Sequence, residues 1–204
     1  PNTTTVYCIA EINVEHGPTV LEVPPGVLGP VDDAYFRWVT DVGFTGPDRG
    51  RGGKYLFLPP GHRGEVPGDC HVVPTRSYRN WLLMRAFVID GDLAKTVAHV
   101  ETHWRLYPLK EAASPREPHF VHLSGQQYST IHANDFSFYE ELNAVVQYEP
   151  ADAFNPELVG LWASIGIKKG NYVLADTLFS KIVREYPEEI LADNALFRSA
   201  DLNE

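Results

Sequence analysis

Cysteine is scarce in this sequence, which has only Cys8 and Cys70 among its 204 residues. Two cysteines are too few for a disulfide framework, and their spacing does not suit a metal site. One bridge between them is an alternative, but we favour two buried thiols. We predict no metal and no cofactor, and we expect a hydrophobic core to hold the fold together.

Basic residues are also few, because 17 Lys and Arg stand against 27 Asp and Glu, a formal net charge of -10. This balance repels phosphate backbones, and no Lys or Arg cluster overrides it locally, so a nucleic-acid partner is not expected. No segment resembles a signal peptide or a membrane-spanning helix. The chain starts at Pro1 inside an expected strand, and we therefore expect the natural protein to extend further at this end.

Glycine and proline are plentiful, with 16 of each, beside 44% hydrophobic and 12% aromatic residues. The apolar content is that of a globular protein, and the Gly and Pro content indicates many turns. Runs of β-branched and aromatic residues predict strands at 3–12, 19–23, 34–44, 54–58 and 80–90. The short turn after the first of these favours a β-meander in which 3–12 is an inner strand.

Arg85 is a charged residue in the strongest predicted strand, 80–90, whose two faces are otherwise apolar. Alternation predicts one face with Arg85 and another opposite it, which hold Trp81, Leu83, Phe87 and Ile89, and Leu82, Met84, Ala86 and Val88, respectively. Such a strand is expected at the centre of a sheet. An unpaired buried charge is costly, so Arg85 needs a partner. Asp41 is the candidate, because alternation along 34–44 separates it from Phe36, Trp38 and Val42 on the other face.

The segment Gly50–Gly53 is a glycine-rich bend before the strand 54–58 and its Pro59–Gly61 stop. A phosphate-binding loop is one interpretation, but such loops lead into a helix. This one leads into a strand. We therefore predict a hairpin loop, in which glycine supplies positive φ angles.

Helices are predicted after residue 91. Asp92 can cap one that ends before Pro108. His99 and His103 have metal-ligand spacing on it, but they lie off the apolar stripe, and we favour an exposed polar face. Two more helices are expected at 134–148 and 155–166, the second capped by its Asn-Pro start.

Residues 1–170 contain a set of collinear pieces: Pro1-Asn2 with Thr5 and Tyr7, Gly17-Pro18 before VLEVP, Asp41, GRGGKYLFLPPG, Thr75, Arg85, Tyr107-Pro108-Leu109, TIHANDFSFYEEL and NPELVGLWASIGIKKG. As a set, these pieces resemble the family named domain of unknown function twelve fifty-four, often labelled as cell-envelope or exported proteins. It implies an antiparallel β-sandwich, jelly-roll-like, followed by α-helices, and therefore an α+β fold. The family tends to have Asp where this chain has Thr4, so a function of that Asp would be missing here.

The tail 171–204 departs from the family and looks like a tetratricopeptide repeat. Residues at the spacing of a repeat's second helix are Gly170, Tyr172, Ala175, Phe179, Ile182 and Pro187. A plain amphipathic hairpin is the alternative. We predict two domains, a partial β-sandwich with helical additions at 1–170 and a tetratricopeptide-like hairpin at 171–204.

The function we favour is a ligand-binding or interaction domain of a cell-envelope-type protein, with a small molecule or glycan as ligand. The candidate ligand-binding residues are Tyr7, Asp41, Tyr55 and Arg85. The alternative is a hydrolase or lyase acting on a small organic substrate, with Asp41 as base and Arg85 orienting an anionic or carbonyl group. For these two residues we favour a structural ion pair, and we assign no catalytic residue. The C-terminal helices could bind a protein partner. The family resemblance alone points to the cell envelope or periplasm.

Overall fold

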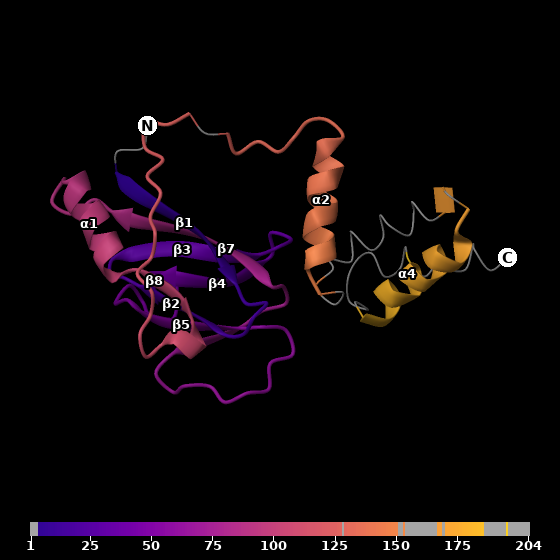
Figure 1. Ribbon diagram of the computed structural model, residues 1–204, viewed down its shortest axis with the longest axis horizontal. Helices are drawn as coiled ribbons and strands as arrows, with labels where there is room; N and C mark the ends of the chain where they lie inside the picture. Colours follow the sequence, from indigo (N-terminus) through magenta and orange to yellow (C-terminus); the bar gives the residue numbers. More distant parts are fainter. Residues whose placement is uncertain are drawn as a thin grey trace. The chain divides into compact units, whose positions relative to one another are not determined.

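The first part of the chain is a β-sandwich of two four-stranded sheets, which form two layers in Figure 1. The computed structural model describes residues 4–127, 129–150, 153, 167–168, 170–185 and 195. The chain divides into two compact units, Pro1–Pro150 and Ala151–Glu204. The predicted α+β sandwich is confirmed. The predicted boundary at residue 170 lies within the second unit, and a domain division there stays a prediction.

Sheet A contains, in spatial order, β1 (Thr5–Asn13), β7 (Arg79–Phe87), β3 (Val27–Asp33) and β4 (Trp38–Gly43). All neighbours in it are antiparallel. The strand that carries Arg85 lies between two others, so the prediction of a central strand is confirmed. The prediction that the first strand is an inner one is wrong, because β1 lies at the edge of sheet A.

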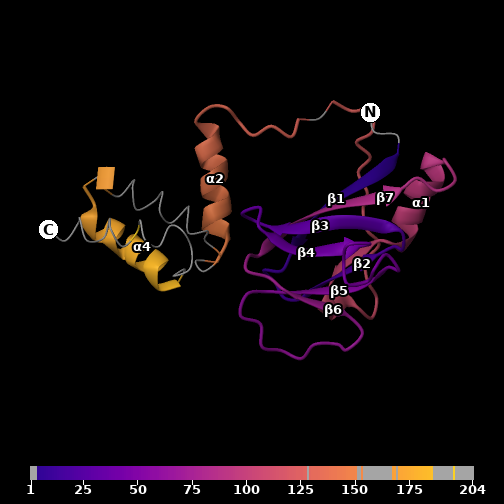
Figure 2. The ribbon, with the colours of Figure 1, turned by 180° about the vertical axis from the view of Figure 1, so that it is seen from behind.

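Sheet B contains β6 (His71–Pro74), β5 (Gly53–Leu58), β2 (Thr19–Val23) and β8 (Arg105–Pro108). The β5 and β6 strands are parallel, and the other pairs are antiparallel. Figure 2 shows β6 in the layer below β3 and β4. The first two strands of the chain lie in different sheets, so the predicted β-meander is wrong. Its short turn carries the chain from one sheet to the other.

The core lies between the sheets and is built by period-two alternation. On β7 the buried residues are Leu82, Met84 and Ala86, which is the face predicted to be opposite Arg85. Leu21 and Phe57 of sheet B are fully buried in the same cluster. Burying each such large side chain contributes about 1.5–3 kcal/mol. One face of sheet A is thereby fixed in the core, and its other face points outward.

The β4 strand is shorter than predicted, and its alternation is interrupted. A turn precedes it, in which Phe36 has a positive φ of 62°. The register between β3 and β4 shifts at Val31/Asp32. This irregularity turns Trp38 outward while Val42 stays fully buried, so the prediction that these two residues share a face is wrong.

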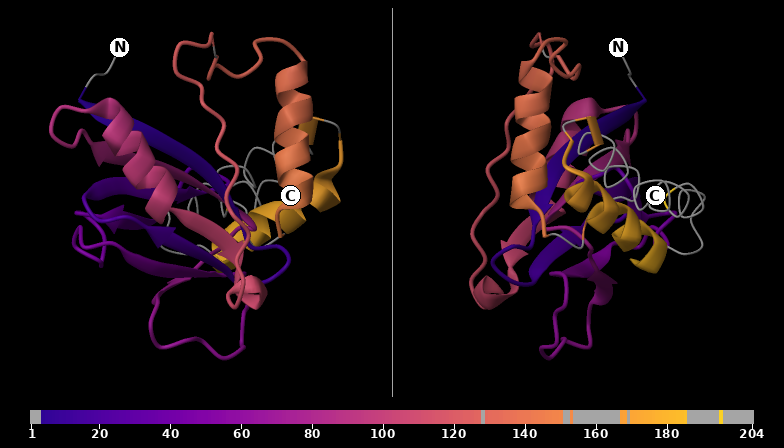
Figure 3. Two further views of the ribbon diagram at one scale, coloured as in Figure 1. Left: turned by 60° about the vertical axis from the view of Figure 1, so that its left-hand side comes forward. Right: turned by 90° about the vertical axis from the view of Figure 1, so that its right-hand side faces the viewer.

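Helix α1 (Leu93–His103) begins at Asp92, whose side chain accepts a hydrogen bond from the Lys95 backbone N–H. This N-cap was predicted. Figure 3 shows α1 beside β1, and its buried Val100 belongs to the core between the sheets. A 3-10 turn, η1 (Leu109–Glu111), follows β8, and α2 (Ser137–Tyr148) ends the first unit.

The second unit contains α4 (Tyr172–Glu185). Its buried residues Ala175, Phe179 and Ile182 cluster with Ala195. The helix predicted at 155–166 lies outside the described residues.

Candidate functional site

The outer face of sheet A is an exposed, largely apolar surface. We use this name for the outward side chains of β1, β7, β3 and β4. Cross-strand pairing places Tyr7 next to Arg85 and Arg85 next to Leu28. Ile9 pairs with Leu83. Four strands therefore contribute to one continuous surface.

Aromatic side chains dominate the two ends of this face. Trp81 pairs with Asp32, which in turn pairs with Trp38. The Phe36 ring stacks on Trp81 with a centroid distance of 5.5 Å. Trp38 is 62% exposed and Ile9 is 52% exposed. Exposed apolar patches of this kind mark interaction surfaces in soluble proteins, because burying them in a partner is favourable.

At the other end of the face, Phe87 and Phe44 extend the apolar surface. Phe87 pairs with Thr5 of β1. The ring of Phe44, which follows β4, lies 6.0 Å from the Phe87 ring between centroids. Both side chains are exposed, and such tilted aromatic pairs hold large apolar groups in a fixed arrangement at a surface.

Arg85 is exposed and not buried as its strand had suggested. Its guanidinium lies 5.4 Å from the centroid of the Tyr7 ring, a cation–π contact. The predicted ion pair with Asp41 is wrong. Asp41 pairs with Pro30 of β3, and Arg85 pairs with Leu28 of the same strand. The β3 strand thus separates the two charges.

Acidic groups gather on the β3 and β4 side of the outer face. The pKa of Asp32 is raised, first by burial and then by the nearby charges of Asp33 and Asp41. Within the described residues, neither Asp32 nor Asp41 forms an ion pair. The face therefore carries Arg85 on β7 and acidic side chains on β3 and β4.

Tyr55 lies in the core and not on the outer face, since its exposed fraction is 0%. Its hydroxyl donates a hydrogen bond to the carboxylate of Asp48. Burial and this bond raise its pKa. Of the four predicted ligand-binding residues, the structure brings together Tyr7, Asp41 and Arg85 on one surface and places Tyr55 elsewhere.

Asp48 is a buried carboxylate that organises the glycine-rich segment. It accepts hydrogen bonds from the Gly43 N–H at 2.7 Å and the Gly52 N–H at 3.0 Å, besides the Tyr55 hydroxyl. The segment joins β4 of sheet A to β5 of sheet B, so the predicted hairpin loop is wrong. Gly50 and Gly52 do have positive φ angles of 75°. Their role is to let the chain cross between the sheets.

Glu149 forms a second buried polar contact, at the end of α2. Its carboxylate accepts hydrogen bonds from the backbone N–H groups of Tyr78 and Arg79, the latter at 3.1 Å. Tyr148 lies beneath the Arg79 guanidinium, 3.9 Å from ring centroid to Cζ. Asn13 donates to the Tyr148 hydroxyl at 2.8 Å. These contacts fasten α2 to the sandwich.

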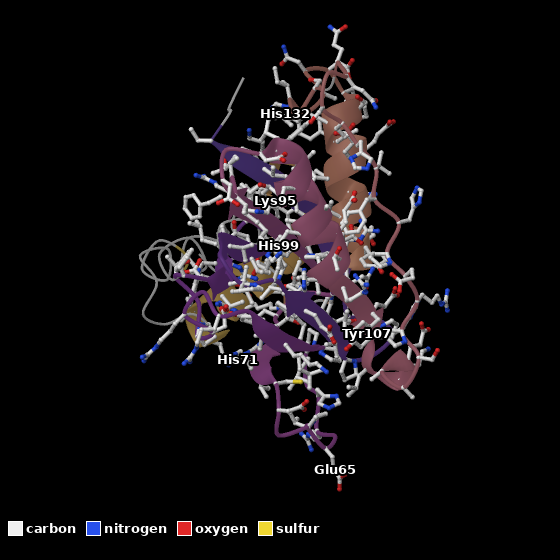
Figure 4. The ribbon with its side chains drawn as sticks, turned by 90° about the vertical axis from the view of Figure 1, so that its left-hand side faces the viewer. Glu65, His71, Lys95, His99, Tyr107 and His132 are labelled. Carbon is white, nitrogen blue, oxygen red and sulfur yellow. The ribbon has the colours of Figure 1, made fainter. Side chains whose placement is uncertain are left out.

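The histidines of α1 lie on its outward surface, where Figure 4 shows His99 and Lys95. His99 Nε2 is 3.2 Å from the Pro25 carbonyl oxygen, and His103 Nδ1 is 2.8 Å from the His99 carbonyl oxygen. No group of three or more His, Cys, Asp or Glu within the described part of the chain could hold a metal ion.

Both cysteines are free thiols and half-buried. Burial raises the pKa of Cys8 to about 11. None of the described helices is long and apolar enough to cross a membrane.

The sequence predicted some of the residues that share the outer face, but it did not predict which strands lie next to each other in sheet A. Trp81, Leu83 and Phe87 were predicted to share a face with Arg85, which is confirmed. Asp32 was missed, because the strand 27–33 was not predicted. Finding Asp32 would have required evidence that the segment 27–33 pairs with the strand 80–90.

Comparison with known proteins gives a family and a fold. A search of curated proteins found no match. The chain resembles the crystal structure of the VPA0106 protein from Vibrio parahaemolyticus, with a TM-score of 0.52 and 19% identity over 93% of this chain. The match covers 50% of that protein, so the chain spans about half its length.

The family model described as protein of unknown function (DUF1254) matches residues 1–108, more than half of the chain. That range holds all eight strands of the sandwich, and with them the whole outer face of sheet A. The chain belongs to the DUF1254 family.

Proposed function

We propose that this protein is a non-catalytic interaction domain that binds its partner through the outer face of sheet A. The observation that carries the proposal is the open, aromatic-rich surface on which Tyr7, Asp41 and Arg85 lie together. An exposed apolar surface is unfavourable in water, and a partner that covers it is stabilising. A place in the cell envelope is a proposal that rests on the family resemblance.

The shape of the surface favours a broad partner over a small molecule. Small-molecule sites are concave and surround most of their ligand. The outer face is one side of a four-stranded sheet, and its aromatic groups lie at both ends of the strands. A glycan laid across the rings or a protein surface fits such a face better than a compact metabolite.

The charged residues support binding and do not support the enzyme alternative. A base and an orienting group must converge on one reacting bond. Asp41 and Arg85 lie on β4 and β7 with β3 between them, and Tyr55 is buried in the core. Their spacing suits separate contacts with an extended partner.

For the C-terminal unit we propose a tetratricopeptide-like hairpin that offers a second surface for a protein partner. The stripe Ala175, Phe179 and Ile182 is buried on one side of α4, as packing against another helix requires. On its other side Val173 is 81% exposed. Removing residues 171–204 should leave the first unit with a cooperative thermal transition. Loss of that transition would contradict the division into two domains.

Nuclear magnetic resonance titration tests the proposed function. Amide shifts of the 15N-labelled chain would be followed in two series, one with a panel of neutral and acidic oligosaccharides and one with increasing concentration of the protein itself. We expect shifts on β1, β7, β3 and β4 in at least one series. Shifts confined to the outward residues of sheet B, such as Val72, or none in either series, would contradict the proposal.

A further inference from the structure

We infer that the partner of the outer face of sheet A is a second copy of this chain, related by a twofold axis that lies over β3. The inference rests on the proposed function, since it names the partner of the same surface. The positions of the charged side chains on that face and the apolar residues around them support a second copy as the partner.

The charges are placed so that a twofold axis would pair them. Asp41 is next to Pro30 on one side of β3, and Arg85 is next to Leu28 on the other side. The midpoint between the two charged residues therefore falls on β3. When two copies meet face to face about an axis through that point, Arg85 of each copy meets Asp41 of the other.

Within one chain, neither Arg85 nor Asp41 forms an ion pair with another described residue. Arg85 contacts the Tyr7 ring, and no described carboxylate is within ion-pair distance of it. Asp41 and Asp32 lie close enough to repel each other. An arginine from a second copy would neutralise that acidic group. A neutral glycan would leave both charges without a counter-charge, which is why we prefer the second copy.

The apolar residues around the charges supply the rest of the interface. Leu28 and Pro30 would lie at the axis, and Leu83 of the neighbouring β7 strand beside it. Two sheets that pack face to face lie about 10 Å apart and interdigitate their side chains. With the axis over β3, the β7, β3 and β4 strands of the two copies overlap, and β1 lies beyond them. Three strands about 4.8 Å apart and roughly 25 Å long give on the order of 350 Å² of projected area. This is smaller than a standard specific interface, so we expect a weak dimer with a Kd of about 1–100 μM.

A charge-exchange experiment with the full chain tests the inference. Two variants are made, Arg85→Asp and Asp41→Arg. In a dimer of either variant, both contacts between positions 85 and 41 join side chains of like charge. The Arg76→Asp and Glu65→Arg variants are the matched controls, since both positions are exposed and lie outside the outer face. Molar mass is measured by sedimentation equilibrium at protein concentrations from about 1 to about 200 μM, a range that spans the expected Kd values. Thermal melts check that each variant is folded.

The wild type and both controls should show a mass that rises from 22.9 kDa towards twice that value. Each single variant should associate at least about tenfold more weakly, because like charges placed opposite each other repel. An equimolar mixture of the two variants should recover the dimer, because both contacts are then Asp with Arg. Leu83→Lys, which alters the apolar part beside the axis, should also weaken association.

Two results would overturn the inference. One is a wild type that stays at 22.9 kDa at all concentrations. The other is a dimer that persists in both single variants or is not recovered on mixing them. In either case oligosaccharide-induced shifts on sheet A would leave the proposed function standing, and their absence would remove that proposal as well.

Discussion

Replacing Asp48 by alanine should destabilise the sandwich more than any change to an exposed carboxylate. The side chain is 2% exposed and accepts hydrogen bonds from the Gly43 N–H, the Gly52 N–H and the Tyr55 hydroxyl. A hydrogen bond to a charged group contributes about 1.5–3 kcal/mol, and a buried donor left without an acceptor costs a similar amount. Partial relaxation and water entry reduce the sum, and we expect a loss of about 3–5 kcal/mol in the free energy of unfolding.

The measurement is urea unfolding followed by circular dichroism, with the free energy extrapolated to water. Asp69→Ala is the matched control, because that carboxylate is exposed. Tyr55→Phe removes one of the three bonds and should cost about 1–2 kcal/mol. The double variant should cost less than the sum of the two single variants, because both lose the same contact. An Asp48→Ala variant within about 1 kcal/mol of its control would refute this account of the crossover between the sheets.

Three further predictions concern the first unit, Pro1–Pro150. Glu149→Ala should lower the free energy of unfolding by about 1–3 kcal/mol and increase hydrogen exchange in α2, because two backbone N–H groups lose their acceptor; unchanged exchange in α2 would contradict this. Stability should fall as pH rises from about 10 to 12, because burial, followed by the charge of Glu149, raises the pKa of Tyr35 to about 12 in the folded chain. The stabilisation from Tyr35 is complete below the pKa of the unfolded chain and is lost as the pH rises through the pKa of the folded chain. Tyr35→Phe should therefore make the decline in stability at alkaline pH less steep, as measured by urea unfolding at a series of fixed pH values. Gly29→Ala should cost at least about 2 kcal/mol by thermal melting, because its Cβ would lie 2.1 Å from the Leu83 carbonyl oxygen; a variant as stable as wild type would show that β3 and β7 are less close.

The sequence predicted those elements whose signals are local. The alternation of 80–90 gave the central strand and both of its faces, since residues of each parity meet a different environment. The Asp92 cap marked the start of α1 because its hydrogen bond joins residues three apart. The strand 27–33 was missed because its Gly29 and Pro30 look like turn residues. Gly29 is needed there because the β7 backbone lies against it.

Non-local arrangements could not be predicted in the same way. Sheet A pairs β1 with β7 and β7 with β3, so its order does not follow the chain. The Arg85–Asp41 ion pair was a reasonable hypothesis from two strands alone, and it failed because β3 lies between them. No sequence signal marked Asp48, because its role depends on the chain crossing from one sheet to the other. Tyr55 was a candidate ligand-binding residue because a lone strand does not show which of its faces is buried in the core.

The most direct test of the outer face of sheet A uses its own tryptophans. In a Trp104→Phe, Trp162→Phe background, the remaining tryptophans are Trp38 and Trp81 on that face. Acrylamide quenching of their fluorescence is compared at 1 and about 200 μM protein, which brackets the Kd expected for an interface of this size. We predict quenching that is reduced severalfold at the higher concentration, as a second copy covers the rings. Equal quenching at both concentrations would contradict the account.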